Sequence, residues 1–249
     1  MITLEVSASN YRGLVRKNNE DMMLVSSRIL RDKSIRTKMR LGKSDNCIFA
    51  VADGLGGYNG GEVASEVVIR NLASFFHSLP EGMTTEEFRT VFNKWIRSMH
   101  EHIVSMGKED ARLIGMGTTL VALVIYEEHI YWLNCGDSRM YRLRSNYLTQ
   151  LTKDHSLESI TGMKSHAHIV VNSIGAGEES YFDFFDCTDY VYDNDLFMLC
   201  SDGLTGMLSD EDIENLLVHS ADSEQLVEEA CHAGGTDNIS VCLVHFIFN

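Results

Sequence analysis

The chain has 249 residues, 44% of them hydrophobic, with a single proline and a formal net charge of −15. This length and apolar content provide a sizeable core, and no Pro-rich or Gly/Ser-rich tract marks a linker, so we expect one domain over residues 1–249. The acidic balance argues against nucleic acid or anionic membranes as partners.

The N-terminal residues and the cysteines bear on where the protein works. The chain starts without the basic segment and apolar core of a signal peptide, and its longest strongly apolar run, 120–126, is too short to cross a bilayer. The six cysteines are scattered singly, which favours reduced core thiols over a zinc site or a disulfide framework. We expect a cytosolic (cytoplasmic) protein that does not insert into a membrane.

The hydrophobic pattern predicts strands first and then a pair of helices. Strand signals occupy residues 2–8, 22–27 and 47–52. A glycine-rich loop at 54–61 then opens a helix with apolar residues at three- and four-residue spacings over 63–76. Residues 84–87 have capping-box spacing and start a second helix that continues to about residue 103.

A second group of strands and helices completes the chain. Further strands are expected at 120–126, 130–135, 140–143, 148–151 and 196–200, and the short connections at 127–129 and 137–139 fit antiparallel hairpins. The region from 154 to about 179 is irregular. Amphipathic helices start at Ser209 and Ser223, before a last strand at 239–248. This order predicts the α+β class with mainly antiparallel sheets.

One segment departs from the acidic character of the chain. Residues 28–43 contain a single acid, Asp32, among the bases Arg28, Arg31, Lys33, Arg36, Lys38, Arg40 and Lys43. Such a segment is typical of a solvated, mobile loop, or of a docking surface for an acidic or phosphorylated partner. The sequence leaves both interpretations open.

Acidic residues stand at the ends of the predicted strands. Asp53 follows the strand at 47–52 and precedes glycines that allow close approach of backbone and ligand. One Asp-Gly pair would be typical of a turn. The same arrangement recurs at Glu20 and Asp21, Asp137, Asp202 and Asp237, which indicates a shared site.

The chemistry of such a cluster points to cations. Two unit charges 4 Å apart repel by about 4 kcal/mol at an effective dielectric constant near 20, so clustered carboxylates require bound cations. Oxygen ligands without His or Cys favour Mg²⁺ or Mn²⁺. Two such ions about 4 Å apart can share a water, lower its pKa and stabilise an in-line displacement at phosphorus. With Arg16 able to grip a phosphate, the residues indicate phosphoester hydrolysis.

Seven motifs, in the family's order, resemble those of the metal-dependent (type 2C) protein serine/threonine phosphatases in their compact bacterial form. They are RKNNED (16–21), ADGLGG (52–57), GMGTT (115–119), CGDSR (135–139), LTKDHS (151–156), CSDGL (200–204) and TDN (236–238). The resemblance runs from about residue 5 to 248. It implies a four-layer α-β-β-α sandwich of two antiparallel sheets flanked by helix pairs, with the metals in a cleft at the sheet ends.

The resemblance also implies the ligands of two bridged Mn²⁺ or Mg²⁺ ions. Asp53 would bridge the two ions. The carbonyl of Gly54 and the carboxylate of Glu20 would bind one ion, and Asp202 and Asp237 would bind the other.

The remaining site residues are carried over in the same way. Asp137, together with Asp202, would hold the third ion typical of bacterial members. Asp21 would hold a metal-bound water, Asn238 would support the ligands, and Arg16 would take the substrate phosphate.

Three departures from the family pattern affect these expectations. Leu55 stands where eukaryotic relatives carry a His proposed to protonate the leaving group, which leaves a metal-bound water or His155 as the general acid. Asn10 replaces a usual Asp, which could soften the positioning of Arg16. The flap beside the cleft, at about 154–179, is short, and a basic insertion at about 28–43 could compensate.

The leading hypothesis is a protein phosphatase that hydrolyses phosphoserine and phosphothreonine by attack of a metal-bridging water. Its partners would be phosphorylated protein substrates and a cognate serine/threonine kinase that it opposes. Two alternatives use the same cleft: a pseudophosphatase that binds phosphoproteins as a regulatory module, and a hydrolase of small phosphate esters.

Overall fold

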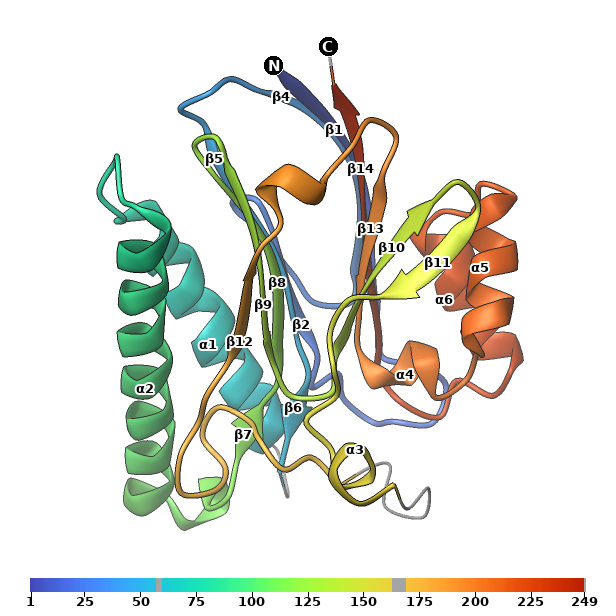
Figure 1. The fold of residues 1–249 in the computed structure, drawn as a ribbon. Helices are drawn as coiled ribbons and strands as arrows, with labels where there is room; N and C mark the ends of the chain where they lie inside the picture. Colours follow the sequence, from blue (N-terminus) through green and yellow to red (C-terminus); the bar gives the residue numbers. More distant parts are fainter. Residues whose placement is uncertain (57–59, 163–168, 249) are drawn as a thin grey trace.

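Two six-stranded antiparallel sheets face each other at the centre of the molecule (Figure 1). The computed structural model describes residues 1–56, 60–162 and 169–248. The first sheet has the order β11 (Tyr147–Gln150), β10 (Arg139–Arg144), β13 (Leu196–Cys200), β14 (Ile239–Phe248), β1 (Ile2–Tyr11) and β4 (Lys33–Leu41). The second has the order β12 (Asp183–Asp186), β9 (His129–Cys135), β8 (Leu120–Tyr126), β5 (Asn46–Ala52), β2 (Met22–Val25) and β3 (Arg28–Leu30).

Helices cover the outer faces of both sheets. The long helices α1 (Gly60–His77) and α2 (Thr85–Glu109) lie on the second sheet, and α5 (Asp210–Val218) and α6 (Ser223–His232) lie on the first (Figure 1). The shorter helices are α3 (Leu157–Thr161) and α4 (Asp202–Thr205), with 3-10 turns η1 (Ala111–Leu113) and η3 (Thr188–Tyr190). The predicted four-layer α-β-β-α sandwich is therefore confirmed.

Apolar periodicity explains how the layers pack. All seven residues of β8 are buried because Val121, Leu123 and Ile125 face the core between the sheets, while the alternate residues face α1 and α2. The capping box predicted at the start of α2 is present, since the side chain of Thr84 accepts from the N–H of Glu87 and the Glu87 carboxylate accepts in return.

A third, two-stranded sheet lies at the end of the second sheet, where β5 ends and β8 begins. It pairs β6 (Gly54–Leu55) with β7 (Gly117–Thr118). At the other end of the chain, β1 pairs with β14 along its whole length, from Ile2 opposite Phe248 to Tyr11 opposite Ile239. None of the helices in the described residues is long and apolar enough to cross a membrane.

Three expectations about local structure were wrong. Residues 28–43 are not a mobile loop, because β3 and β4 occupy most of this segment. The connection at 137–139 is not a hairpin, since β9 belongs to the second sheet and β10 to the first. The region after residue 154, expected to be irregular, contains α3. The strand β12, which the sequence did not predict, follows this region. Part of the predicted flap, 163–168, lies outside the described residues.

Candidate metal and phosphate site

The acidic strand ends meet in one cavity of about 370 Å³ at the end of the sandwich where β6 and α4 lie (Figure 1). Eight of the nine predicted site residues line it, and Asp21 is buried behind its wall. The lining residues are Arg16, Glu20, Asp53, Gly54, Leu55, Gly56, Thr119, Asp137, Val170, Asp202, Asp237 and Asn238.

The backbone of Asp53 is fixed by Thr118 and Thr119, at and just after the end of β7, rather than left as a free turn. Its N–H donates to Thr119 Oγ1 (3.0 Å), and its carbonyl accepts from Thr119 N (2.8 Å) and Thr118 Oγ1 (2.9 Å). Gly54 has no room for a side chain, because a Cβ there would lie 2.1 Å from the Gly61 carbonyl oxygen. The Asp-Gly pair is therefore built to hold one carboxylate and one carbonyl in a crowded corner.

The carboxylates of the site raise one another's pKa. Burial, and then the charges of Asp21 and Asp202, raise the pKa of Asp53 well above its ordinary value. Burial, and then the charges of Asp202 and Asp154, raise the pKa of Asp137 to about 7. The pKa of Glu20 is also raised, mainly by burial. A cation placed among these carboxylates would offset both the cost of burying their charges and their mutual repulsion.

Asp21 lies directly behind the cavity and is fully buried. Its Oδ2 accepts from Ser201 Oγ and from Ser240 Oγ, both at 2.7 Å. Its Oδ1 is buried with no hydrogen-bond partner among the described residues. Burial raises the pKa of Asp21 to about 7. A buried carboxylate oxygen left unpaired is a costly arrangement that fits a role toward a cation or its water.

Arg16 contacts the acids from the solvent side. Its guanidinium donates to Asp237 Oδ2 at 2.5 Å, and this contact, with Glu20 and Asp53 nearby, raises its pKa. Among the described residues no group of three or more His, Cys, Asp or Glu is arranged as a ready metal site. Since the Arg16 guanidinium is paired with the Asp237 carboxylate, a cation that binds Asp237 competes with Arg16.

Asn238 connects the segments that carry the other residues. Its Oδ1 accepts from Glu20 N (2.8 Å), and its Nδ2 donates to the carbonyls of Arg12 (2.8 Å) and Asn18 (3.0 Å). The loop that carries Arg16 and Glu20 is thereby fastened to the start of β14. This geometry suits the supporting role expected for Asn238.

The donor set of this cavity fits divalent cations that prefer oxygen. The polar groups that face it are carboxylates, a carbonyl, a hydroxyl, an amide and one guanidinium, with no His or Cys in its lining. Mg²⁺ and Mn²⁺ favour such ligands. The raised pKa values and the unpaired Asp21 Oδ1 show that this donor set suits added positive charge.

His155 supports the turn that carries Asp137 and is not placed as a general acid. Its Nδ1 accepts from Gly136 N (3.1 Å) and from Asn172 Nδ2 (2.8 Å), and its Nε2 lies 3.1 Å from Asp183 Oδ2. Both ring nitrogens are engaged, so neither is free to protonate a leaving group. Leu55 lines the cavity and offers no proton either.

Sequence reasoning missed several supporting residues. Thr119, Ser201 and Ser240 hold Asp53 and Asp21, and Asp183 orients His155. Thr119 stands in the quoted GMGTT motif, which was a signal for its importance. Ser201 stands in the quoted CSDGL motif, directly before Asp202. Ser240 and Asp183 contact Asp21 and His155 across large separations in the chain, and no local pattern marks them.

Two comparisons of sequence find relatives along nearly the whole chain. The family model of Protein phosphatase 2C matches residues 31–246. The serine/threonine phosphatase stp of Listeria welshimeri is 33% identical over 248 residues, covering 94% of this chain and 92% of that protein. Protein phosphatase PhpP of Streptococcus pneumoniae is 31% identical over 256 residues, covering 97% of each chain.

Solved structures share the fold over the same extent. The S. agalactiae serine/threonine phosphatase has a TM-score of 0.82 at 28% identity, covering 97% of this chain and 98% of that one. The catalytic domain of the serine/threonine protein phosphatase PstP, solved in complex with 2 manganese ions, has a TM-score of 0.77 at 29% identity, with 100% of both chains covered.

Proposed function

The chain belongs to the protein phosphatase 2C family and is a protein serine/threonine phosphatase, and we propose that it hydrolyses phosphoserine and phosphothreonine with the help of Mn²⁺ or Mg²⁺. The observation that carries this proposal is the single cavity that gathers five carboxylates and Arg16 from distant parts of the chain. The manganese ions of the related PstP catalytic domain support it.

The residues divide into those that would hold cations and those that would hold the phosphate. Asp53, Glu20 and the Gly54 carbonyl would hold one ion. Asp53 would also hold a second ion, together with Asp202 and Asp237. Asp137 would join Asp202 at a third. When bound, divalent cations activate water and neutralise charge on the phosphoryl oxygens.

The chain's own groups would then act on the substrate. Arg16 would leave Asp237 and take two phosphate oxygens, a charge-assisted arrangement that fixes the phosphorus in the cavity. Asn238 would keep the Arg16–Glu20 loop in place during this exchange. Leu55 and Val170 would limit solvent around the phosphoester. Since neither Leu55 nor His155 can supply a proton, a water molecule in the cavity would supply the proton for the departing seryl or threonyl oxygen.

The test is metal-dependent turnover of an aryl phosphate and of phosphothreonine, phosphoserine and phosphotyrosine peptides. We expect activity with Mn²⁺, its loss in EDTA, and a preference for phosphothreonine and phosphoserine. Asp53→Asn and Asp202→Asn should reduce turnover strongly. Wild-type turnover by either variant with Mn²⁺ would refute the assignment of the ligands.

The cellular setting is a separate part of the proposal. We infer that the protein acts in the cytosol on phosphoproteins, and that it opposes a serine/threonine kinase. The names of the related stp and PstP proteins as serine/threonine phosphatases support the substrate class. Incubation with an autophosphorylated serine/threonine kinase from the same cell, followed by phosphosite mass spectrometry, tests this inference, and an unchanged phosphorylation pattern would contradict it.

A further inference from the structure

The basic segment that interrupts the acidic chain forms a free edge of the first sheet. β4 pairs with β1 on one side and has no other strand neighbour among the described residues. Ile35 and Met39 point toward the core between the sheets, so the alternate side chains point outward. We call these outward side chains, Arg36, Lys38 and Arg40, the basic row. All three are exposed.

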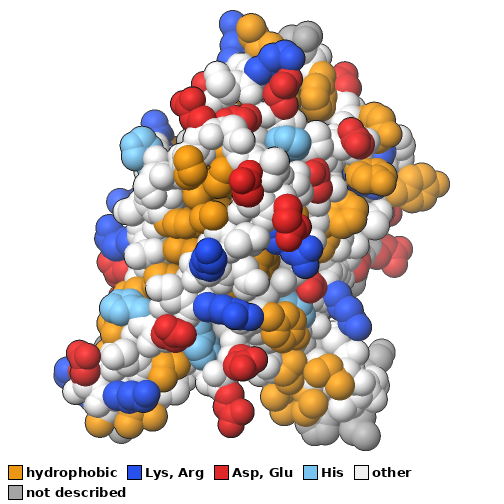
Figure 2. Space-filling view, turned by 60° about the vertical axis from the view of Figure 1, so that its left-hand side comes forward, with side chains coloured by type: hydrophobic (Ala, Val, Ile, Leu, Met, Phe, Trp, Pro, Cys, Tyr) orange, Lys and Arg blue, Asp and Glu red, His pale blue; other side chains and the backbone are white. Residues whose placement is uncertain are grey.

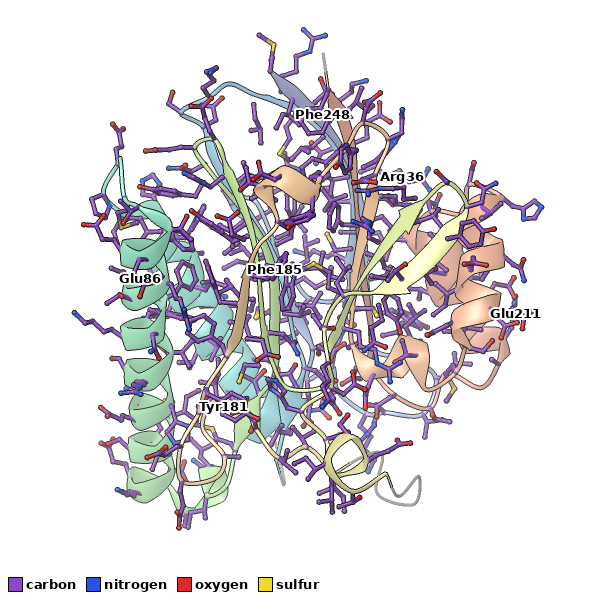
Figure 3. The ribbon with its side chains drawn as sticks, viewed as in Figure 1. Arg36, Glu86, Tyr181, Phe185, Glu211 and Phe248 are labelled. Atoms are coloured by element: carbon purple, nitrogen blue, oxygen red, sulfur yellow. The ribbon has the colours of Figure 1, made fainter. Side chains whose placement is uncertain are left out.

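A groove of about 760 Å³ runs beside the basic row on the outer face of the sheet. The cross-strand register places Lys38 opposite Glu5, Glu5 opposite His245, and His245 opposite Leu196. Leu143, Leu196, Leu217 and Leu243 line the groove and continue the apolar core under α5 and α6. Figure 3 shows Arg36 on the same side of the sheet as these helices, beyond their ends. Arg36 and Lys38 line one side of the groove together with their ion-pair partners Asp222 and Glu5, and the leucines form its apolar floor.

The present partners of the basic row are weak competitors for an added ligand. Arg36 pairs with Asp222 and Glu224, and Lys38 Nζ lies 2.6 Å from Glu5 Oε1. Arg40 has no ion-pair partner in the part of the chain that the structure describes. The side chains of Arg36 and Lys38 are 62% and 58% exposed, and exposed pairs of this kind contribute little to stability. Carboxylates of a bound peptide can replace Asp222, Glu224 and Glu5 as the partners of Arg36 and Lys38.

The direction of β4 connects the groove to the cavity. Asp32, just before the strand, donates its N–H to Asn10 Oδ1 and accepts from Asn19 Nδ2, beside the segment that carries Glu20 and Asp21. From Lys33 onward, β4 leads away from this segment. At about 3.4 Å per residue, Arg36 lies about 10 Å and Arg40 about 24 Å along the strand from Lys33.

We propose that this groove docks an acidic, extended segment of the phosphoprotein substrate, a role that rests on the proposed phosphatase function. In an extended peptide alternate side chains repeat about every 7 Å on one side, which matches the spacing of the basic row. Acids at alternate positions would meet Arg36, Lys38 and Arg40, and a neighbouring apolar side chain would reach the leucine floor. Lysine and arginine on an edge strand also discourage aggregation, but that role requires no apolar floor beside them.

The test compares two phosphothreonine peptides with the same phosphorylated core. One carries three Glu at alternate positions followed by Leu, about eight residues from the phosphothreonine, and the other carries Ser at these four positions. The variant is Arg36→Glu/Lys38→Glu/Arg40→Glu. The matched control is Arg89→Glu/Lys94→Glu/Arg97→Glu on the exposed side of α2, where basic and acidic side chains are interspersed (Figure 2).

We expect wild type to prefer the acidic peptide by about tenfold in kcat/KM, mainly through KM, with the preference decreasing as salt is raised. The β4 variant should lose the preference, the α2 control should keep it, and turnover of aryl phosphate should be equal in all three. If the β4 variant does not fold by circular dichroism, Arg36→Gln/Lys38→Gln/Arg40→Gln should show the same loss.

Three results would overturn the docking role. Wild type could treat both peptides alike, or the α2 control could lose the preference equally, which would make it an effect of net charge. Alternatively, the basic row could be needed for sedimentation with phosphatidylserine vesicles while the peptides are not discriminated. Absence of metal-dependent aryl phosphate hydrolysis would instead refute the proposed function, so the two failures are distinguishable.

Discussion

Replacement of Arg16 by alanine separates the two roles that its position suggests. In the structure Arg16 pairs with Asp237, and the two side chains are 52% and 35% exposed. An ion pair this exposed contributes at most about 1 kcal/mol to stability. Arg16→Ala should therefore lower the free energy of unfolding by no more than that amount.

The effect on catalysis should be larger. Hydrogen bonds to a charged group are worth about 1.5 to 3 kcal/mol, and a loss of about 2 to 3 kcal/mol corresponds to a roughly 30- to 150-fold lower kcat/KM. Binding of Mn²⁺ should change in the opposite direction. Asp237 would be released from its pair and a neighbouring positive charge removed, so the affinity should increase, by up to about fivefold for 1 kcal/mol.

Three measurements check this reasoning on one variant. Urea unfolding in EDTA gives stability, calorimetric titration gives Mn²⁺ affinity, and steady-state kinetics on a phosphothreonine peptide gives kcat/KM. Arg12→Ala is a suitable control, because Arg12 lies on the same loop and its guanidinium donates only to the Lys17 carbonyl among the described residues. Unchanged kcat/KM, or weaker Mn²⁺ binding, would show that Arg16 does not exchange Asp237 for phosphate.

The other predictions concern the carboxylates and their supports. Gly54→Ala should abolish metal-dependent activity and lower the melting temperature, because a Cβ would lie 2.1 Å from the Gly61 carbonyl oxygen; a fully active variant would contradict the crowding. The pKa of Asp21 and of Asp137 is about 7 in the folded protein, above the ordinary value of 3.8, so the metal-free protein should lose stability as pH rises from about 4 to 7, by up to about 4 kcal/mol per group. Asp21→Asn should flatten this dependence in urea titrations. Saturating Mn²⁺, at one hundred times Kd, should add about 2.7 kcal/mol of stability, seen as a higher melting temperature. His155→Gln should lower stability but leave the shape of the pH–rate profile unchanged; loss of one limb of the profile would instead make His155 a general acid.

The acids at strand ends could be predicted because polarity changes abruptly there. Each continuous apolar run is buried, so the carboxylate that follows or precedes it marks where the chain leaves the core, as at Asp53 and Asp202. That these ends meet in one cavity is a property of the whole fold; the recurrence of acids at strand ends indicated a shared site, and the ordered motifs of the family indicated which residues form it.

Other features depend on contacts that no local pattern records. Residues 136–138 are short enough for a hairpin, but Arg139 pairs with Cys200 in the other sheet. β12 reads Asp-Phe-Phe-Asp, which lacks the alternation that marks a strand, and it forms because β9 offers a free edge. The hydrogen bond between His155 and Asp183 forms only when β12 and the segment before α3 are both in place.

The pairing of β1 with β14 gives the chain a particular order of assembly. β1 pairs with the nearby β4 on one side, but its other partner, β14, lies far along the chain at residues 239–248, so the first sheet cannot close until that strand is available. Arg16, on the loop that follows β1, and Asp237, just before β14, come together only at that closing step. We therefore expect slow folding dominated by this long loop closure, with catalytic competence acquired last.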